Sequence, residues 1–579
     1  MTGVVAEPDV RVPLMVGAIG HRDLVASELD ALKARVREFL EELRRKYPDL
    51  RVTVLTSLAD GADRLVGDVA QSLGVPIVYV LPMPTELYER DFGESSKAEY
   101  REILGSSNVL TLPLVGGNTA DDVTHPGPAR DLQYAQLGAF IAAHCHVLLA
   151  LWDGRENGGS GGTAQIIRFH QDDFMPGLTD GEPRSRLDDT DDESDLVFHV
   201  VCSRDRPDGA PAASLRPGEA WWLSRDDREP RTRAMPDRYE IVLRRMVEFS
   251  RDVVAHRESI AQAHNILLPT DGGIEIGDGD RAIATLFGTA DWLARHYQRL
   301  TLIALRVVYG FAALAGVCFI AYGDLPNLPD QDLMIYPYLV FVAAMLGAYQ
   351  YARRGAWQRK YLDYRVLAEA LRVQFYWAVA GVERPAPSRF GHDLFLKRQD
   401  LELGWIRNML RVAGRRDDAG GHAVPEAGID FAVRDWIGDE ESGQHSYYRR
   451  RALRLLSVHR ITELLDRTSF AAGLIIAAWL AAAHYWFATE PTDIWVALMG
   501  FLPLAAALRQ AYANRTAEQE LITQYQFMDR IMANARRQLQ HTVRPSERRK
   551  ILHELGIAAL IEHGQWLLRL RERPIAAPS

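Results

Sequence analysis

The segment LTLIALRVVYGFAALAGVCFIAY, residues 300–322, is followed closely by LMIYPYLVFVAAMLGAYQY, residues 333–351. Each is about as long as the roughly 20 mostly apolar residues that a helix needs to cross a hydrocarbon layer of about 30 Å. The connection GDLPNLPDQD contains a glycine, two prolines and acidic residues, which is typical of a tight turn in water. The sequence therefore predicts a transmembrane helical hairpin. The alternative is a buried hairpin in the core of a large soluble protein.

The positions of the basic residues predict the orientation of this hairpin. They precede and follow it, whereas the turn holds only acidic charges; the flanking bases are Arg295, Arg299, Arg353, Arg354, Arg359 and Lys360. Because Lys and Arg are in excess on the cytoplasmic side, both ends of the hairpin are expected there. Arg306 lies about two turns inside the first segment. Either its long side chain reaches back to the headgroups, or it serves gating or a lipid contact.

The composition describes a chain that is only partly membrane-embedded. A chain of 579 residues predicts three or four structural units, and a mean hydropathy of -0.15 requires large soluble parts. The net charge of -10 argues against nucleic acid as a partner. The three cysteines have no metal-type spacing, so we expect neither a metal nor a disulfide framework. The N-terminus shows no cleaved signal peptide.

Residues 8–235 predict an α/β domain. Apolar runs of strand length begin at Val10, Arg51, Val75, Ser107 and His146, and helical stretches separate them. Such alternation indicates a parallel sheet covered on both faces. An acidic segment, residues 170–195, is expected to be a flexible insert. The run from Leu196 is expected to close the sheet edge, and the Trp221-Trp222 pair to anchor a loop.

Candidate ligand-binding residues follow three of these strands. They are Gly17, Gly20, His21 and Arg22; Asp60, Gly61, Asp63 and Arg64; and Asp153, Gly159, Gly161, Gly162 and Thr163. Glycine-rich loops at the carboxyl ends of parallel strands can present backbone amides and cations to a phosphate. We therefore predict a nucleotide-type ligand and no further cofactor. Purely structural turns and helix-capping carboxylates are the alternative.

These loops resemble the SLOG superfamily, which includes the LOG phosphoribohydrolases. The resemblance rests on Gly17-x-x-Gly20, on Asp60-Gly61 and on Gly159-x-Gly161-Gly162-Thr163, and it implies a Rossmann-like nucleotide-binding fold. LOG enzymes carry a catalytic glutamate in the motif PGGxGTxxE, and Ile166 occupies that position here. An aliphatic side chain is no general base, so the resemblance implies ligand binding without an assigned catalytic residue.

The second half of the chain repeats the layout of a basic helix, an apolar hairpin and a heptad-patterned helix. A first module is expected at residues 238–380, a linker at 381–445 and a second module at 446–574, with spans at 469–488 and 494–513. Pro503 and Arg509 interrupt the last span, and Arg509 is a second candidate membrane or gating residue. Apolar seams through Tyr364, Leu371, Tyr525 and Met532 predict self-association into a homo-oligomer.

The two modules resemble SLATT domains, the two-transmembrane effectors that accompany SLOG domains in bacterial conflict systems. The stretches ADWLARHYQ (from Ala290), YRVLAEALRVQFYW (from Tyr364) and LGIAALIEHGQWLLRLRERP (from Leu555) carry the resemblance. It implies a pore-forming or membrane-disrupting effector in the bacterial inner membrane, acting in antiphage defence, with cytoplasmic termini. A membrane-anchored nucleotide or NAD glycohydrolase and a membrane scaffold are the alternatives.

Overall fold

The chain forms two compact units, each described here by itself. The computed structural model describes residues 11–106, 108–156, 161–172, 174–179, 195–225, 230–269, 274, 276–325, 330–382, 403–413, 426–487 and 493–571. The first unit comprises Met1–Thr289 with Ala370–Pro425, and the second Ala290–Glu369 with Glu426–Ser579. Gly159, most of the predicted acidic insert and much of the predicted linker lie outside the described residues.

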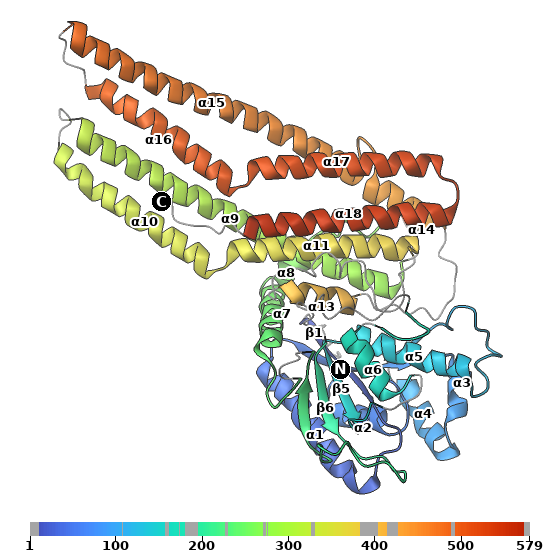
Figure 1. The fold of residues 1–579 in the computed structure, drawn as a ribbon. Helices are drawn as coiled ribbons and strands as arrows, with labels where there is room; N and C mark the ends of the chain where they lie inside the picture. Colours follow the sequence, from blue (N-terminus) through green and yellow to red (C-terminus); the bar gives the residue numbers. More distant parts are fainter. Residues whose placement is uncertain are drawn as a thin grey trace, which may run out of the picture. The chain divides into compact units, whose positions relative to one another are not determined.

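An eight-stranded sheet is the centre of the first unit (Figure 1). Its strands are β1 (Pro13–Gly20), β2 (Arg51–Thr56), β3 (Ile77–Leu81), β4 (Asn108–Thr111), β5 (Val147–Trp152), β6 (Val197–Val201), β7 (Ala220–Leu223) and β8 (Arg231–Thr232). They lie in the order β4-β3-β2-β1-β5-β6-β7-β8. The pairs from β4 to β6 are all parallel, which confirms the predicted parallel sheet.

Two expectations about the far end of this sheet are wrong. The run from Leu196 forms β6, which is an interior strand, because β7 pairs with it in antiparallel fashion and β8 extends the edge. Trp221 and Trp222 lie in β7 rather than in a loop. Trp222 is paired with Phe198 of β6, with ring centroids 4.9 Å apart, so the tryptophan packs as part of the sheet.

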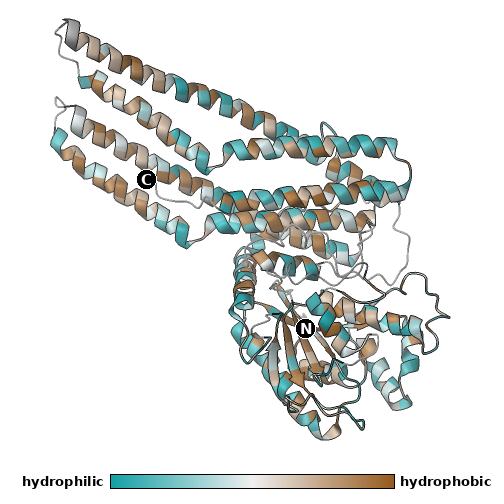
Figure 2. Cartoon of the chain, in the orientation of Figure 1, coloured by the Kyte–Doolittle hydropathy of each residue, from teal (hydrophilic) through white to brown (hydrophobic). Residues whose placement is uncertain are grey.

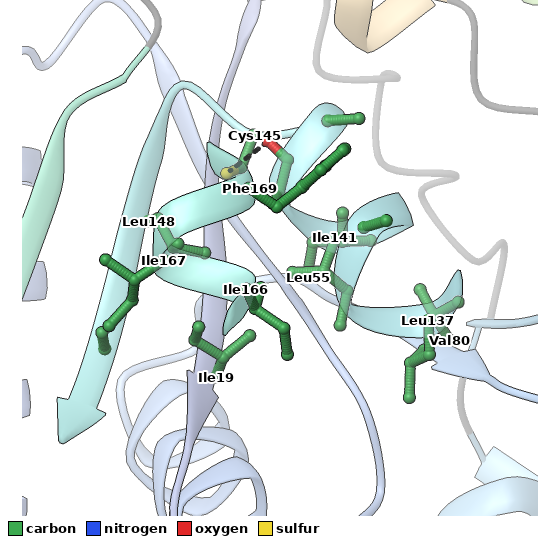
Figure 3. Packing of buried hydrophobic residues seen from close by; sticks show 14 of the residues in the cluster. Ile19, Leu55, Val80, Leu137, Ile141, Cys145, Leu148, Ile166, Ile167 and Phe169 are labelled. Atoms are coloured by element: carbon green, nitrogen blue, oxygen red, sulfur yellow. Dashed lines mark hydrogen bonds between the residues drawn. The ribbon is translucent and has the colours of Figure 1, made fainter. Parts of the chain in front are cut away.

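Helices cover both faces of the sheet. Those of the first unit include α1 (Leu29–Lys46), α2 (Ala62–Ser72), α3 (Thr85–Tyr88), α4 (Glu94–Ser106), α5 (Pro128–Ala143), α6 (Thr163–Asp172), α7 (Asp237–Ala255), α8 (Arg257–Ala261) and α13 (Gly404–Ala413). Successive strand side chains point to opposite faces. Met15 and Ile19 of β1 accordingly join the apolar cluster under α5 and α6 (Figure 3). On the other face Phe39 of α1 stacks on Phe198, with centroids 4.1 Å apart.

The second unit is helical. It is built from parts of α9 (Asp278–Asp324) and α11 (Trp357–Ala380), and from α10 (Ile335–Arg354), α14 (Glu426–Phe431), a π-helical turn (Ala432–Ile437), α15 (Gly443–Phe487), α16 (Asp493–Arg515), α17 (Glu518–His541) and α18 (Pro545–Arg571). Four helical stretches, within Asp278–Gly323, Gln331–Ala380, Gly443–Ala483 and Asp493–Arg515, are long and apolar enough to cross a membrane. Large apolar side chains of these stretches are exposed in many places, for example Phe319, Val340 and Ile475. Figure 2 shows hydrophobic residues along all four helices.

Close backbone packing joins these apolar helices. A Cβ atom on Gly316 of α9 would lie 2.4 Å from Leu504 of α16, so α9 and α16 touch where glycine leaves room. A Cβ atom on Gly473 of α15 would likewise lie 3.2 Å from the ring of Pro503. Pro503 lies inside α16 without ending the helix, which runs unbroken from Asp493 to Arg515. The residue that weakened the sequence prediction for this span is therefore accommodated by a glycine of its hairpin partner.

The seams that predicted self-association are buried within one chain. Tyr364, Leu371 and Met532 are each at most 2 % exposed. A second copy therefore has no access to these three side chains, whereas Tyr525, the fourth residue of the predicted seams, is half-buried.

A duplicated, left-handed joint follows the second helix of each hairpin. The sequences YARRGA, ending at Ala356, and YANRTA, ending at Ala517, precede α11 and α17. Ala356 has φ +50° and Ala517 has φ +51°, a conformation that costs a residue with a Cβ atom about 1–2 kcal/mol. The same joint in both halves supports the internal duplication seen in the sequence. It ends one helix and starts the next in a new direction (Figure 1).

Because β-branched residues are least compatible with positive φ, Ala356→Val is expected to lower stability by about 1–3 kcal/mol, whereas Ala356→Gly is tolerated. The measurement is thermal unfolding of the purified full-length chain in detergent. Ala343→Val, at an exposed helical position of α10, is the matched control. Equal melting temperatures for Ala356→Val and this control would contradict a left-handed joint at Ala356.

Candidate functional site

The topology of the sheet defines where a ligand can enter. The chain passes from β1 outward through β2, β3 and β4, and then returns to place β5 on the other side of β1. The loops after β1 and β5 therefore diverge, and open α/β sheets bind ligands at this switch point. The loops after β1, β2 and β5 carry predicted binding residues, so topology brings together groups that are far apart in the sequence.

His21 and Asp153 connect the β1 and β5 loops beneath the surface. Both are buried, and the backbone N–H of Asp153 donates to His21 Nε2 at 3.2 Å. Burial is the main cause that lowers the pKa of His21, so the ring is neutral at pH 7 and Nε2 is an acceptor. The 3.3 Å approach of Nε2 to Asp153 Oδ1 is then no ion pair. The Asp153 carboxylate accepts from the Arg155 amide at 3.0 Å, which leaves this pair a structural role.

Gly20 and Gly61 permit close packing between the β1 loop and α2. Gly61 has φ +86°, and a Cβ atom there would lie 2.4 Å from the carbonyl oxygen of Arg22. The first amide of α2, that of Ala62, already donates to the His21 carbonyl at 3.0 Å. A Cβ on Gly20 would lie 2.4 Å from Ala62. The first amide at the N-terminus of α2 is therefore already hydrogen-bonded within the chain.

Gly17 lies away from the carboxyl edge. It is inside β1, where a Cβ atom would lie 2.8 Å from the sulfur of Cys145. Its place in the structure is the packing of β1 against the end of α5.

Arg64 and Asp60 bind side chains of α4. The Arg64 guanidinium contacts Glu99 at 2.7 Å and Asp60 at 3.0 Å, and it lies 5.1 Å from the Phe92 ring centroid. Asp60 also accepts from the Ser96 hydroxyl at 2.6 Å. Both were predicted as ligand-binding residues, and the structure gives both of them partners within the protein.

A polar cluster with unsatisfied atoms lies around Arg22 and Asp63. Ser57, directly after β2, donates to one oxygen of Asp63, and the other oxygen, Oδ1, is buried with no hydrogen-bond partner among the described residues. The hydroxyl of Tyr88, a residue that is fully buried, also lacks such a partner in the described part of the chain. Tyr88 interacts electrostatically with Asp63. Buried polar atoms are rarely left unpaired, so these two atoms indicate a place for a ligand or water.

Charge and an aromatic ring complete this cluster. The exposed Arg22 places its guanidinium 5.0 Å from the Tyr134 ring centroid, and its charge interacts with Asp63, Asp91 and Tyr88. Burial raises the pKa of Asp63 to about 6, although the Ser57 hydrogen bond and the charge of Arg22 act in the opposite direction. A cation, an aromatic face, a buried hydroxyl and a carboxyl group that titrates near neutral pH therefore converge. We call Arg22, Ser57, Asp63, Tyr88 and Tyr134 the switch-point cluster.

Arg22 and Asp63 were predicted from the sequence, but Ser57, Tyr88 and Tyr134 were not. Ser57 follows a strand directly, and its position after β2 is a signal that sequence reasoning could have used. Tyr88, in the short helix after β3, and Tyr134, in the middle of α5, carry no comparable local signal.

The glycine-rich loop after β5 leads into α6. Gly161 has φ +77° and packs against α5, where a Cβ atom would lie 2.9 Å from the Ala135 amide nitrogen. Its own N–H donates to Gln165, and Thr163 starts α6 as a buried residue. The Gly162 carbonyl accepts from the amides of Gln165 and Ile166. The described part of this loop thus closes onto α5.

Ile166 packs within the apolar cluster of the α/β unit (Figure 3). A Cβ atom on Gly138 of α5 would lie 2.3 Å from its terminal methyl carbon, so the two helices lock together at this position. The position that is glutamate in LOG enzymes therefore contributes packing here.

The two candidate arginines of the helical unit differ in their surroundings. Arg306 is exposed on α9. Arg509 contacts both oxygens of Glu518, at 2.9 and 3.2 Å, and so ties the end of α16 to the first turn of α17. The described residues contain no cluster of three or more metal-ligating side chains. No family of proteins, curated protein or solved structure matches this chain.

The raised pKa of Asp63 predicts a pH-dependent stability. Protonation favours the folded state, and this contribution is complete below the unfolded pKa of 3.8 and lost as the pH rises through about 6. Asp63→Asn removes the titration, so the variant is expected to gain about 1 kcal/mol on the parent between pH 5 and pH 7.5. The measurement is the difference in thermal unfolding between the two full-length proteins at each pH.

Asp68→Asn, at an exposed acid on the same helix, serves as the comparison for this experiment. A parent and Asp63→Asn variant that stay equally far apart at both pH values would show that Asp63 titrates as an ordinary surface acid.

Proposed function

We propose that this chain is a ligand-gated membrane effector, in which the α/β unit binds a nucleotide-derived signal and the helical unit responds in the bilayer. One observation carries the proposal. A doubly wound sheet with unsatisfied polar atoms at its switch point shares one chain with four membrane-length apolar helices. The first feature fits a sensor of a small polar ligand, and the second fits an effector that acts on a membrane.

The switch-point cluster has the chemistry to hold a nucleotide of the NAD, ADP-ribose or cyclic-nucleotide type. Arg22 supplies a cation for a phosphate, and Tyr134 supplies a ring face near it. The Tyr88 hydroxyl and Asp63 Oδ1 fit the hydroxyl groups of a ribose, because one can donate and the other can accept. Hydrogen bonds to charged groups contribute roughly 1.5–3 kcal/mol each, which is enough for selective binding.

The membrane layout that we propose is two hairpins with all chain ends and the α/β unit in the cytoplasm of a bacterial cell. Basic residues at the ends of the hairpins and acidic residues in their turns support this orientation. The SLOG and SLATT resemblances add that the output is a pore or a disrupted inner membrane in antiphage defence. Since the spans carry few polar side chains, a conducting path would form between several copies.

A hydrolase is the second candidate, and Asp63 favours it. A buried carboxyl group with a pKa of about 6 beside a cation is suited to general acid–base chemistry, for example on a glycosidic bond. The core position of Ile166 speaks against the LOG arrangement of catalytic groups. Incubation of the protein with NAD and chromatography of the products separates the two candidates. If the parent converts NAD and Asp63→Asn does not, the protein is an enzyme and the sensor proposal is wrong.

Ligand binding is expected to depend on the Tyr88 hydroxyl. A thermal-shift screen of the full-length protein with NAD, ADP-ribose and cyclic nucleotides should find at least one compound that raises the melting temperature. Tyr88→Phe removes one hydrogen bond and should weaken that compound roughly tenfold, because an unpaired polar partner costs about 1–3 kcal/mol. Tyr79→Phe, at another buried tyrosine of the same small core, is the matched control.

No shift with any of these compounds, or equal affinities for Tyr88→Phe and Tyr79→Phe, would contradict a nucleotide site at the switch-point cluster.

The orientation predicts which introduced cysteines react from outside the cell. Asp332→Cys, in the turn of the first hairpin, should be labelled by a membrane-impermeant maleimide in intact cells. Val543→Cys, at a position that is 89 % exposed between α17 and α18, should react only after the cells are opened. Labelling of Val543→Cys in intact cells would overturn the proposed topology.

A further inference from the structure

The helical unit contains a pocket of about 210 Å³ where its two halves meet. Residues of α9, α11, α15, α16, α17 and α18 line it. It lies beside the joint at Ala517, since Arg515, Thr516 and Glu518 are among its walls. Its position is therefore set by the duplicated architecture, at the ends of the apolar helices.

The lining of this pocket is amphiphilic. Leucines of five helices form its apolar side: Leu302, Leu305, Leu362, Leu455, Leu521 and Leu570. Arg451 of α15 and Arg515, the last residue of α16, bring two cations to it. Glu518 is the acidic member of the lining, but its carboxylate is bonded to Arg509 at 2.9 and 3.2 Å. The lining therefore contains two basic side chains and one acidic side chain, and the acidic one is bonded to an arginine outside the lining.

The lining residues lie at the ends of the apolar helices, where the proposed layout places the surface of the bilayer. Leu302 and Leu305 are in the first turns of the apolar segment 300–322, and Arg515 ends the last apolar helix. A volume of 210 Å³ is below the roughly 300–1,000 Å³ of pockets that enclose small-molecule ligands, so a whole nucleotide does not fit. A phosphate group with the start of an acyl chain does fit, and basic pockets between membrane helices attract such headgroups.

We propose that this pocket binds the phosphate of an anionic phospholipid of the cytoplasmic leaflet. The phosphate lies between Arg451 and Arg515, and the glycerol and first methylene groups contact the leucines. Because α9 comes from the first half of the duplication and α15 to α17 from the second, the lipid joins the two halves. The inference rests on the proposed placement of these helices in a membrane, which the cysteine labelling tests independently of any arginine.

The test is lipid binding to the purified full-length chain in a nonionic detergent. Phosphatidylglycerol and the zwitterionic phosphatidylcholine are titrated, with bound lipid counted by native mass spectrometry and thermal stability followed in parallel. The parent is expected to prefer phosphatidylglycerol. The double variant Arg451→Gln/Arg515→Gln should lose about tenfold or more in affinity for it, since it lacks both charged donors. Arg454→Gln, exposed on α15 and outside the pocket lining, should bind like the parent.

Inorganic phosphate and glycerol 3-phosphate form a further arm of the experiment. If they stabilise the parent as strongly as phosphatidylglycerol, and with the same dependence on the arginines, the site takes a soluble phosphate and the lipid assignment is overturned. Equal affinity of the double variant and Arg454→Gln for phosphatidylglycerol, or equal binding of both lipids by the parent, also overturns it. If labelling confirms the topology while the lipid experiment fails, the proposed function stands without this site.

Discussion

The two units differ in how far their apolar side chains are buried. This difference determines the surroundings in which each unit is stable. In the α/β unit, the sheet residues are covered by helices of the same unit, so the fold is complete in water. In the helical unit, large apolar side chains remain exposed along α9, α10, α15 and α16. Leaving one such side chain in water forgoes about 1.5–3 kcal/mol relative to burial. The helical unit therefore needs an apolar environment, and a bilayer supplies one.

The sequence predicted the features that depend on local pattern. Apolar runs and helical periodicity marked β1 to β6 and the four long helices, because both signals lie within a single element. Pairing depends on residues distant in the sequence, which is why β6 was expected at the edge and Trp222 in a loop. The same limitation explains the seam residues. The spacing of Tyr364 and Leu371 revealed an apolar face correctly, but spacing alone does not tell a partner in the same chain from one in a second copy.

The site was predictable to a similar extent. Strand ends and glycine turns predicted Arg22 and Asp63, and they also predicted Arg64, Gly17 and Gly61, which have close contacts within the protein. Tyr88 and Tyr134 join the switch-point cluster only through tertiary structure. What marks the cluster is that buried polar atoms without partners occur together with a cation and an aromatic ring, a combination that exists only once the chain is folded.

For such a cluster to control a membrane unit, ligand binding must favour one arrangement of the chain over another. Moving an equilibrium from 1:99 to 99:1 takes about 5.5 kcal/mol of differential affinity. Several charge-assisted bonds at Arg22 and Asp63 are of that order if they form in only one state. The left-handed joints at Ala356 and Ala517 are sites where an apolar helix ends and the next helix begins at a residue with positive φ.

Ion flux through reconstituted liposomes tests the central claim most directly. The full-length protein is incorporated into vesicles of phosphatidylethanolamine and phosphatidylglycerol that hold a potassium gradient, and NAD, ADP-ribose and cyclic AMP are added to the side that exposes the α/β unit. The proposed function predicts that one of these ligands dissipates the gradient for the parent and not for Arg22→Ala. Loss of the gradient that is independent of all three ligands, or equal in Arg22→Ala and the parent, would contradict the account.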